Sequence, residues 1–461
     1  MDLNNVHSVY FVGIGGIGMS ALARYFSYLG KDVYGYDKNE TKLTKKLVAE
    51  GIEIHYKDDV NLIPEIFAKD KKASLIVYTP AIPKDHTELN YFIDNSFIMH
   101  KRAEILGLIT RDYKTIAVAG THGKTSVSTI ASHILKQSNL ACFAFLGGIS
   151  KNTNSNLILP KTSSAEKVVV VEADEFDRSF LHLNPYIALI TSIDADHLDI
   201  YEDKADLVNS FEHFVKNIGQ NGILICKNNI NLQVDSSVKQ YTYSLEDTAD
   251  FYANNLQMNN DGTYSFDLET PKGVIKQLRM GMPGRINAEN AVAAAALAVL
   301  SDVEEDVVRT QLGSFKGVKR RFDFQIATES FVFIDDYAHH PEELKAFISS
   351  VKEMFPGKKI TGVFQPHLYS RTRDFADEFA LSLGMLDELI LLDIYPAREK
   401  PIEGVSSKII FDKVKLDKKT MCVKNELLMQ FQDNKPEVLL TMGAGDIDKL
   451  IESIKGSLNL K

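Results

Sequence analysis

Short apolar runs alternate with helix-like segments along the whole chain, and this alternation restricts its fold more than any other feature. The runs at residues 9–12, 33–36 and 74–78 have the length of strands, and each leads into a glycine-rich or polar loop. Alternation of this kind is typical of α/β proteins built on mainly parallel sheets. In such sheets the ligand-binding loops lie at the carboxyl ends of the strands.

The pattern begins again at residue 114 and once more at residue 331, after a basic, linker-like segment around 315–324. A chain of 461 residues is too long for one ordinary hydrophobic core, since roughly 150 residues per domain is typical. We predict three domains: a Rossmann-like domain at 1–112, a P-loop ATPase-like domain at 113–317 and a second Rossmann-like domain at 318–461. Further strands are predicted at 114–119, 167–171, 187–193, 331–334, 360–364, 389–392 and 438–441, and a core helix at 291–300.

Charge and composition exclude several classes of protein. A net charge of −10 argues against a general nucleic-acid binder, because a phosphate backbone favours clustered Lys and Arg. No segment reaches the roughly 18 uninterrupted apolar residues of a membrane helix, and the first ten residues lack the pattern of a secretory signal. The three widely spaced cysteines suggest buried, reduced thiols. We therefore expect a cytoplasmic protein with no nucleic-acid or membrane partner; its oligomeric state is not predicted.

The first glycine-rich loop, residues 13–18, has the sequence Gly-Ile-Gly-Gly-Ile-Gly and follows a predicted strand. An acidic residue, Asp37, lies about twenty positions further on, as in dinucleotide-binding folds. Glycines let backbone N–H groups approach a diphosphate at a helix N-terminus, where the partial positive charge favours it. The sequence thus predicts a diphosphate-containing ligand, NAD or another nucleotide. The candidate binding residues are Gly15, Gly16, Ile17, Gly18 and Asp37.

A second glycine-rich loop lies between the strand predicted at 114–119 and the next helix, where a phosphate-binding loop belongs. It is shorter than the general P-loop pattern, since Val118 stands where the first glycine would be. Backbone amides are expected to hold the β-phosphate of ATP, Lys124 to reach the β- and γ-oxygens, and Thr125 to bind Mg²⁺ through its hydroxyl. The candidate ATP-binding residues are Gly120, Thr121, His122, Gly123, Lys124, Thr125 and Ser126.

Two residues at the ends of the following strands are further candidate metal ligands. Glu172 ends a very apolar strand, and His197 ends the next one. Mg²⁺ prefers oxygen ligands, so a histidine suggests a second metal site or tolerance of Mn²⁺. Taken singly, a strand-end acid is also compatible with a cap or surface group, and a lone histidine with a hydrogen-bonded polar residue.

Several separated motifs resemble, in order, those of the muramyl peptide ligases. They lie at residues 13–22, 120–126, 172–175, 196–199, 284–287, 320–323 and 335–341, and they cover all three predicted domains. The first loop is most similar to that of the members that add L-alanine. The resemblance implies an ATP-dependent amide-bond ligase that joins L-alanine to UDP-N-acetylmuramate through an acyl phosphate, in the synthesis of peptidoglycan precursors. It also implies that the first loop binds UDP and not NAD.

The resemblance assigns roles to individual residues. It implies that Lys124 and Thr125 hold ATP and Mg²⁺, and that Glu172 and His197 bind metal. Asn287 would contact adenine, Arg321, with Arg320, the γ-phosphate, and Asp336 the ATP ribose. Tyr337, His339 and Arg371 would line the site where alanine and the muramoyl carboxylate meet.

A base is expected near the amine of alanine, because that amine is mostly protonated in water. His197 and His339 are the candidates, since an imidazole titrates near neutrality. Two positions depart from the family pattern. Leu368 stands where related ligases often carry an arginine, and Glu212 stands where other members use a carbamylated lysine.

Three other functions stay open from the sequence. The nearest is a recycling ligase that joins a tripeptide to the same UDP-sugar. From other classes, an NAD-dependent oxidoreductase and a non-enzymatic nucleotide switch share one or the other of the two glycine-rich loops.

Overall fold

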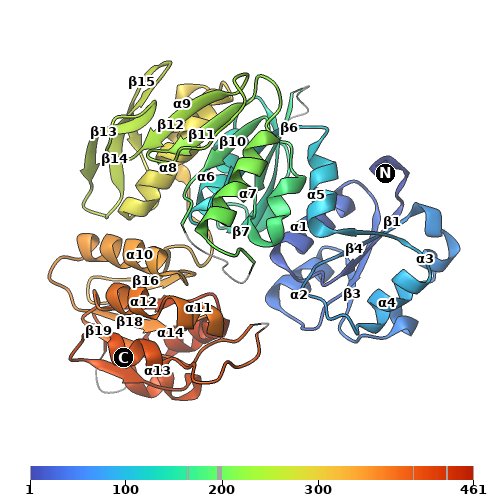
Figure 1. The fold of residues 1–461 in the computed structure, drawn as a ribbon. Coiled ribbons are helices and arrows are strands. Elements are labelled where there is room, and N and C mark those ends of the chain that lie inside the picture. The colour runs from blue at the N-terminus through green and yellow to red at the C-terminus, as the bar shows by residue number, and fades with distance from the viewer. Residues whose placement is uncertain are drawn as a thin grey trace.

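The computed structural model describes residues 2–161, 164, 166–194, 200–397, 399–431 and 435–459. Its sheets follow one another along the chain as three separate α/β units (Figure 1). The predicted class, a three-domain α/β protein with mainly parallel sheets, is confirmed. The exact limits of the three domains remain a proposal. Among the described helices, none combines the length and the apolar character needed to cross a membrane.

The first sheet is parallel, with the strand order β3-β2-β1-β4-β5. Its fully buried strand β1 lies in the middle. Because the chain builds outward first on one side of β1 and then on the other, the order reverses there, and the first glycine-rich loop leaves β1 at this switch point. The elements are β1 (Ser8–Val12), α1 (Ile17–Tyr28), β2 (Asp32–Tyr36), α2 (Lys42–Ala49), β3 (Glu53–His55), α3 (Ile66–Lys69), β4 (Ser74–Tyr78), α4 (Thr87–Asp94), β5 (Ile98–Lys101) and α5 (Arg102–Thr110).

The central sheet has the order β15-β14-β13-β12-β11-β10-β6-β9-β7-β8. Its middle strands are parallel, and both edges are antiparallel: β7 with β8, and the meander β13–β14–β15, which the sequence pattern did not predict. The strands are β6 (Lys114–Ala119), β7 (Ala141–Ser150), β8 (Ser155–Ile158), β9 (Lys167–Glu172), β10 (Ile187–Ile190), β11 (Ile223–Lys227), β12 (Lys239–Ser244), β13 (Phe251–Met258), β14 (Tyr264–Thr270) and β15 (Gly273–Arg279).

The strand predicted at 187–193 is shorter than expected, and the prediction for residues 191–193 was wrong. The strand ends at Ile190 because the following residues bond to the phosphate loop. Thr191 donates its hydroxyl to the carbonyls of Ala119 and His122, and the Ser192 carbonyl accepts from the Thr121 amide.

The helices of the central domain are α6 (Lys124–Leu135), α7 (Lys204–Lys216), α8 (Arg285–Leu300) and α9 (Glu305–Ser314). The predicted core helix at 291–300 is confirmed as the larger part of α8, whose alanines are completely buried. Small side chains allow α8 to pack closely against α6, the helix that follows the phosphate loop. This packing fixes the start of α6 and therefore the loop itself.

The C-terminal sheet has the order β16-β17-β21-β18-β19-β20, in which only β16 is antiparallel to its neighbour within the described ranges. In Figure 1 helix α10 lies on the side of this domain that faces the central domain, and it contacts α8. The elements are β16 (Asp323–Ala327), β17 (Val332–Asp336), α10 (Pro341–Met354), β18 (Ile360–Phe364), α11 (Tyr369–Asp374), α12 (Ala376–Leu383), β19 (Glu388–Leu391), α13 (Lys408–Lys413), β20 (Lys419–Met421), β21 (Val438–Met442) and α14 (Ile451–Asn459).

The three domains are joined differently. The first and central domains share one apolar cluster, in which α1 packs on β7 and β8 through contacts such as Tyr25 with Phe145. The fully buried residues of the two C-terminal clusters belong to that domain, and Ile286 of the central domain packs against one of them. The junction also has polar contacts, such as the ion pair of Lys151 with Asp323 at 2.7 Å. A junction with polar contacts of this kind is suited to domain movement.

Candidate active site

Two cavities lie where the three domains meet. The large cavity has a volume of about 1060 Å³ and the small cavity about 470 Å³. The large cavity is lined by all three domains, including Ile17, Gly18, Thr121, Lys124, Thr125, Glu172, Arg321, Tyr337, His339 and Arg371. The small cavity lies between the central and C-terminal domains and is lined by residues including His122, Gly123, Ser126, Asn287, Arg321 and Asp336. Most of the predicted site residues are thus brought to two adjoining spaces.

The phosphate loop owes its shape to two glycines with positive φ. Gly120 has a φ of 126° and Gly123 a φ of 81°, both in the region that favours glycine. A Cβ at Gly120 would also overlap the Thr191 hydroxyl. The Ser192 hydroxyl accepts from the His122 amide at 2.9 Å, so the residues that follow β10 also hold the loop in its shape.

Lys124 begins α6, and a buried carboxylate fixes its ammonium group. Nζ donates to both oxygens of Glu175, at 2.9 and 2.8 Å, and to the Gly120 carbonyl at 2.6 Å. Burial alone would lower the pKa of Lys124, but the charges of Glu175, Asp174 and Glu172 outweigh it and raise that pKa. Lys124 is therefore a cation held over the loop. Glu175 was not predicted as a site residue, although it lies in the motif at 172–175.

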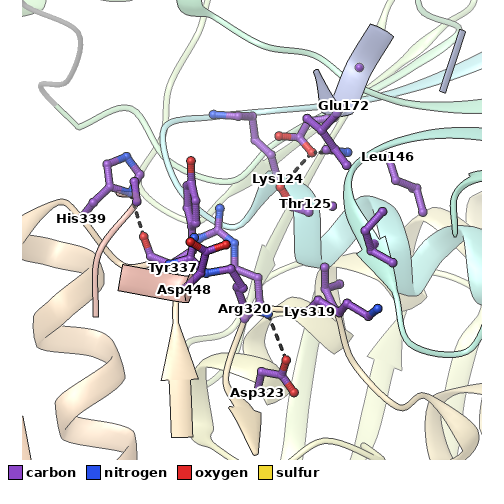
Figure 2. A pocket seen from close by; sticks show the side chains of 18 of the residues that line it. Lys124, Thr125, Leu146, Glu172, Lys319, Arg320, Asp323, Tyr337, His339 and Asp448 are labelled. Atoms are coloured by element: carbon purple, nitrogen blue, oxygen red, sulfur yellow. Dashed lines mark hydrogen bonds between the residues drawn. The ribbon is translucent and has the colours of Figure 1, made fainter. Parts of the chain in front are cut away.

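The two predicted metal ligands on described residues are adjacent. Figure 2 shows Thr125 bonded to Glu172 beside Lys124; Oγ1 donates to Oε2 at 2.8 Å. Neighbouring oxygens in an octahedral Mg²⁺ shell lie about 3 Å apart, so this hydroxyl and carboxylate fit that ion. Burial raises the pKa of Glu172, and the nearby Lys124 opposes the rise. The third predicted ligand, His197, lies outside the described residues.

The small cavity contains the two residues predicted to contact adenine and ribose. Asn287, near the start of α8, donates its amide to the Pro283 carbonyl at 2.7 Å. The carboxylate of Asp336 accepts from the Phe322 amide at 2.6 Å and the Ala338 amide at 2.7 Å. Burial raises the pKa of Asp336 to about 6. Asp336 therefore also fixes Phe322, which lies in the hinge segment, residues 315–324, between the central and C-terminal domains.

The two hinge arginines have different positions. Arg320 is bound within its own domain, by Asp335 at 3.3 Å and by the Gly443 carbonyl at 2.5 Å. Arg321 lines both cavities. Each guanidinium lies 5.0 Å from the centre of the Tyr337 ring. Of the two, Arg321 is placed to reach a phosphate in the small cavity.

The remaining predicted residues of the C-terminal domain lie in the large cavity. His339 is fixed through Nδ1, which lies 3.0 Å from the Tyr337 carbonyl (Figure 2). The same nitrogen lies 3.2 Å from Glu343. Arg371 is 6% exposed and lines the same space. Leu368, where an arginine was expected, is buried there with a φ of 69°. Glu343 was missed from the sequence, where it reads only as a capping glutamate of α10.

The first glycine-rich loop contributes only in part. Ile17 and Gly18 line the large cavity, whereas the Gly15 amide donates to Asp37 inside the domain at 2.8 Å. The Asp37 carboxylate also accepts from the Asn39 amide. The residues that line the two cavities do not include Gly15, Gly16 or Asp37.

The basic side chains of the large cavity that were not predicted include Lys42, Arg102 and Lys319. Arg102 packs against the loop, since a Cβ on Gly18 would lie 2.9 Å from its Cδ. These cations come from two domains, and no local pattern in the sequence joins them. They make this end of the large cavity suitable for a diphosphate.

Family models match each part of this architecture. Residues 8–114 match the catalytic domain of the Mur ligase family, residues 118–298 the Mur ligase middle domain, and residues 320–445 the Mur ligase glutamate ligase domain. The chain belongs to the Mur ligase family. The family predicted from the sequence motifs is thereby confirmed, and the ATP dependence of Mur ligases agrees with the phosphate loop described above.

Individual Mur ligases match over their full length. The chain is 54% identical to UDP-N-acetylmuramate–L-alanine ligase of Parabacteroides distasonis, covering 99% of this chain and 98% of that protein. It is 52% identical to the protein of the same name from Porphyromonas gingivalis, covering 97% and 98%. Among solved structures, UDP-N-acetylmuramate–alanine ligase of Thermotoga maritima superposes with a TM-score of 0.80 at 26% identity, covering 98% and 99%. A murein peptide ligase of Psychrobacter arcticus, at 20% identity and a TM-score of 0.71 over 98% of each chain, shares the fold.

Proposed function

We propose that this Mur ligase joins L-alanine to UDP-N-acetylmuramate, using ATP and forming ADP and phosphate. Relatives that match over the full length, at 54% and 50% identity, are named UDP-N-acetylmuramate–L-alanine ligase. The structural observation that carries the proposal is the meeting of a phosphate-loop cavity with a second cavity lined by cations of all three domains. The reaction belongs to the synthesis of peptidoglycan precursors.

The chemistry requires activation of a carboxylate, which is a poor electrophile with a poor leaving group. In the proposed first step, an oxygen of the muramoyl carboxylate attacks the γ-phosphorus of ATP, and the bond to ADP breaks. Lys124 and Arg321 would neutralise the charge on the phosphoryl oxygens during this transfer. The product is an acyl phosphate, which carries phosphate as a good leaving group.

In the second step, the free amine of L-alanine attacks the carbonyl carbon, and phosphate leaves. The nitrogen loses a proton in this step, and His339 would accept it. Its position in the large cavity and the contact of its Nδ1 with the Tyr337 carbonyl support this role. Arg371 would bind the carboxylate of the amino acid. The three domains around the cavity would exclude water, which would otherwise hydrolyse the acyl phosphate.

Thr125 and Glu172 would hold Mg²⁺, with Mn²⁺ as a substitute. The ion would neutralise charge on the phosphate oxygens. Before ATP binds, the Thr125 hydroxyl donates to the carboxylate that would share the ion, so both ligands are already in place. His197 is proposed as a further ligand from the sequence alone.

At the other end of the large cavity, Lys42, Arg102 and Lys319 would bind the diphosphate of the UDP-sugar beside Gly18. The Gly15 amide already donates to Asp37 and is not free to bind phosphate. The first glycine-rich loop would therefore form part of the wall of the cavity at this end. UDP therefore replaces NAD as the proposed ligand.

The alternatives receive less support. The murein peptide ligase of P. arcticus is 20% identical to this chain, a level that shows the fold alone, whereas relatives named for L-alanine reach 54% identity. In an NAD-dependent oxidoreductase, Lys124 and the phosphate loop would have no function. In a nucleotide switch, a second cavity lined by cations would have no function. With buried thiols and ATP as a substrate, we propose that the enzyme acts in the cytoplasm.

Product analysis tests the function. Purified protein is incubated with ATP, Mg²⁺ and UDP-N-acetylmuramate, together with L-alanine, glycine, L-serine or an L-Ala-containing tripeptide. We expect the mass of the alanyl product, with some glycine product, because one methyl group contributes only about 1–3 kcal/mol to discrimination. Efficient use of the tripeptide and not of alanine would favour the recycling reaction.

A further inference from the structure

The wall between the two cavities is made by two side chains of the C-terminal domain. Among the described residues that line the cavities, Arg321 and Glu343 are the ones shared by both. A phosphoryl group that passes from ATP in the small cavity to a carboxylate in the large cavity must pass this wall. The arginine suits that position, but a carboxylate there would repel phosphate unless its charge were balanced.

The two oxygens of Glu343 have separate partners. Oε2 accepts from the backbone amides of His339 at 3.0 Å and His340 at 3.3 Å, which completes the capping box of α10. Oε1 points away from the helix, 3.4 Å from Nδ1 of His122 in the phosphate loop and 3.7 Å from Nη1 of Arg321. One carboxylate thus ties the start of α10 to the central domain and to the hinge.

The surroundings keep this carboxylate ionised. Burial would raise the pKa of Glu343, but His339 and His122 outweigh burial and hold it well below the usual range. The side chain is 11% exposed, so solvent screens these contacts little. A fixed negative charge 3.7 Å from Nη1 of Arg321 can orient that guanidinium without contacting the substrate itself.

We propose that Glu343 is a positioning residue for phosphoryl transfer, which holds the guanidinium of Arg321 in the wall when α10 docks against the phosphate loop. This inference rests on the proposed function. It assigns to the C-terminal domain a specific catalytic contribution: docking of α10 brings Arg321 to the γ-phosphate. Glu343 acts through Arg321.

The decisive experiment is a double-mutant cycle in the full-length enzyme with Glu343→Gln and Arg321→Ala. The glutamine oxygen can keep the capping bonds of α10, while the negative charge is lost and a donating NH2 group replaces the oxygen that faces His122 and Arg321. We expect Glu343→Gln to lower kcat on the order of 10–100-fold, with KM for ATP changed by less than about 3-fold. In the Arg321→Ala background, the same change should lower kcat by less than about 3-fold.

The matched control is Glu378→Gln, which removes an exposed acid from the first turn of α12 in the same domain. Its kcat should equal that of the parent, and thermal unfolding should show that every variant is folded. An unchanged kcat in Glu343→Gln, or an equal loss in both Arg321 backgrounds, would overturn the proposal. Failure of the proposed function would instead appear in the unmodified enzyme, as phosphate release that does not depend on UDP-N-acetylmuramate and L-alanine.

Discussion

Lys124 donates hydrogen bonds to both carboxylate oxygens of Glu175, a residue with no exposed surface. The pair lies directly above the phosphate loop, so the cation that would hold ATP is fixed before ATP arrives. Bound phosphate would have to share this ammonium with Glu175. The pair therefore links the stability of the central domain to the chemistry of the site.

Removing one member of this pair should destabilise the protein. Lys124→Met leaves Glu175 as a buried, unpaired charge, which costs about 3–5 kcal/mol in comparable pairs. Combining it with Glu175→Gln should recover most of the free energy of unfolding, while amide formation stays lost because no cation remains for the phosphates. Denaturant unfolding and the ligase assay on the same samples measure both quantities. Equal stability of Lys124→Met and the parent would show that the pair is not a stabilising contact.

The metal dependence should follow Thr125 and Glu172. Chelation should stop the reaction, and Mg²⁺ or Mn²⁺ should restore it. Thr125→Val should raise the metal concentration needed for half-maximal activity at least 10-fold, because one of the proposed oxygen ligands is lost. Thr129→Val, one turn further along α6, removes a hydroxyl that donates to the Thr125 carbonyl and should leave that concentration unchanged. A metal titration identical for Thr125→Val and the parent would rule out the threonine as a ligand.

The cysteines should resist thiol reagents in the native protein. Burial raises the pKa of Cys142 and of Cys226 to about 12, and that of Cys422 to about 11. A raised thiol pKa keeps the protonated form at pH 8, where roughly one thiol in a thousand or fewer would be the reactive thiolate. Labelling at pH 8 should therefore be slow until a denaturant is added, when all three cysteines react. Rapid labelling of the native protein at one equivalent or more would contradict the described burial.

Asn156 should control the attachment of the first domain. This buried side chain accepts from Arg24 and donates to the Ile17 carbonyl at 2.5 Å and the Ser20 hydroxyl at 2.9 Å, across the domain junction. Asn156→Ala removes these hydrogen bonds, each of which contributes about 0.5–1.5 kcal/mol, while Arg24 keeps Glu50 and Ser20 keeps the Ile17 carbonyl as a partner. We expect a lower unfolding midpoint and a higher KM for the UDP-sugar, because Ile17 begins the helix beside the large cavity. Unchanged values of both would show that the junction does not need this contact.

Local patterns predicted the parts of the fold that depend on local structure. The strand at 114–119, its glycine-rich exit and the buried helix at 291–300 are all encoded by neighbouring residues, so the phosphate loop was found with its Lys124 and Thr125. The strand predicted at 187–193 failed at its end because Thr191 bonds to a loop seventy residues earlier, which no local pattern contains.

The same distinction applies to the site. The contacts of Glu175 and Glu343, like the convergence of Lys42, Arg102 and Lys319, arise from the packing of separate segments and domains. The sequence supplied the residues of the motifs but not their partners. The roles given to Asn287 and Asp336 came from the family resemblance alone and stay predictions.

The central claim is that the sugar carboxylate is phosphorylated by ATP before the amine attacks. UDP-N-acetylmuramate labelled with ¹⁸O in its carboxylate tests this most directly, by mass analysis of the released phosphate. Through an acyl phosphate, one carboxylate oxygen is transferred to phosphate for each amide bond formed, and no ¹⁸O-phosphate is expected when L-alanine and the sugar nucleotide are not both present. Phosphate free of ¹⁸O, released at the rate of amide formation, would contradict this claim.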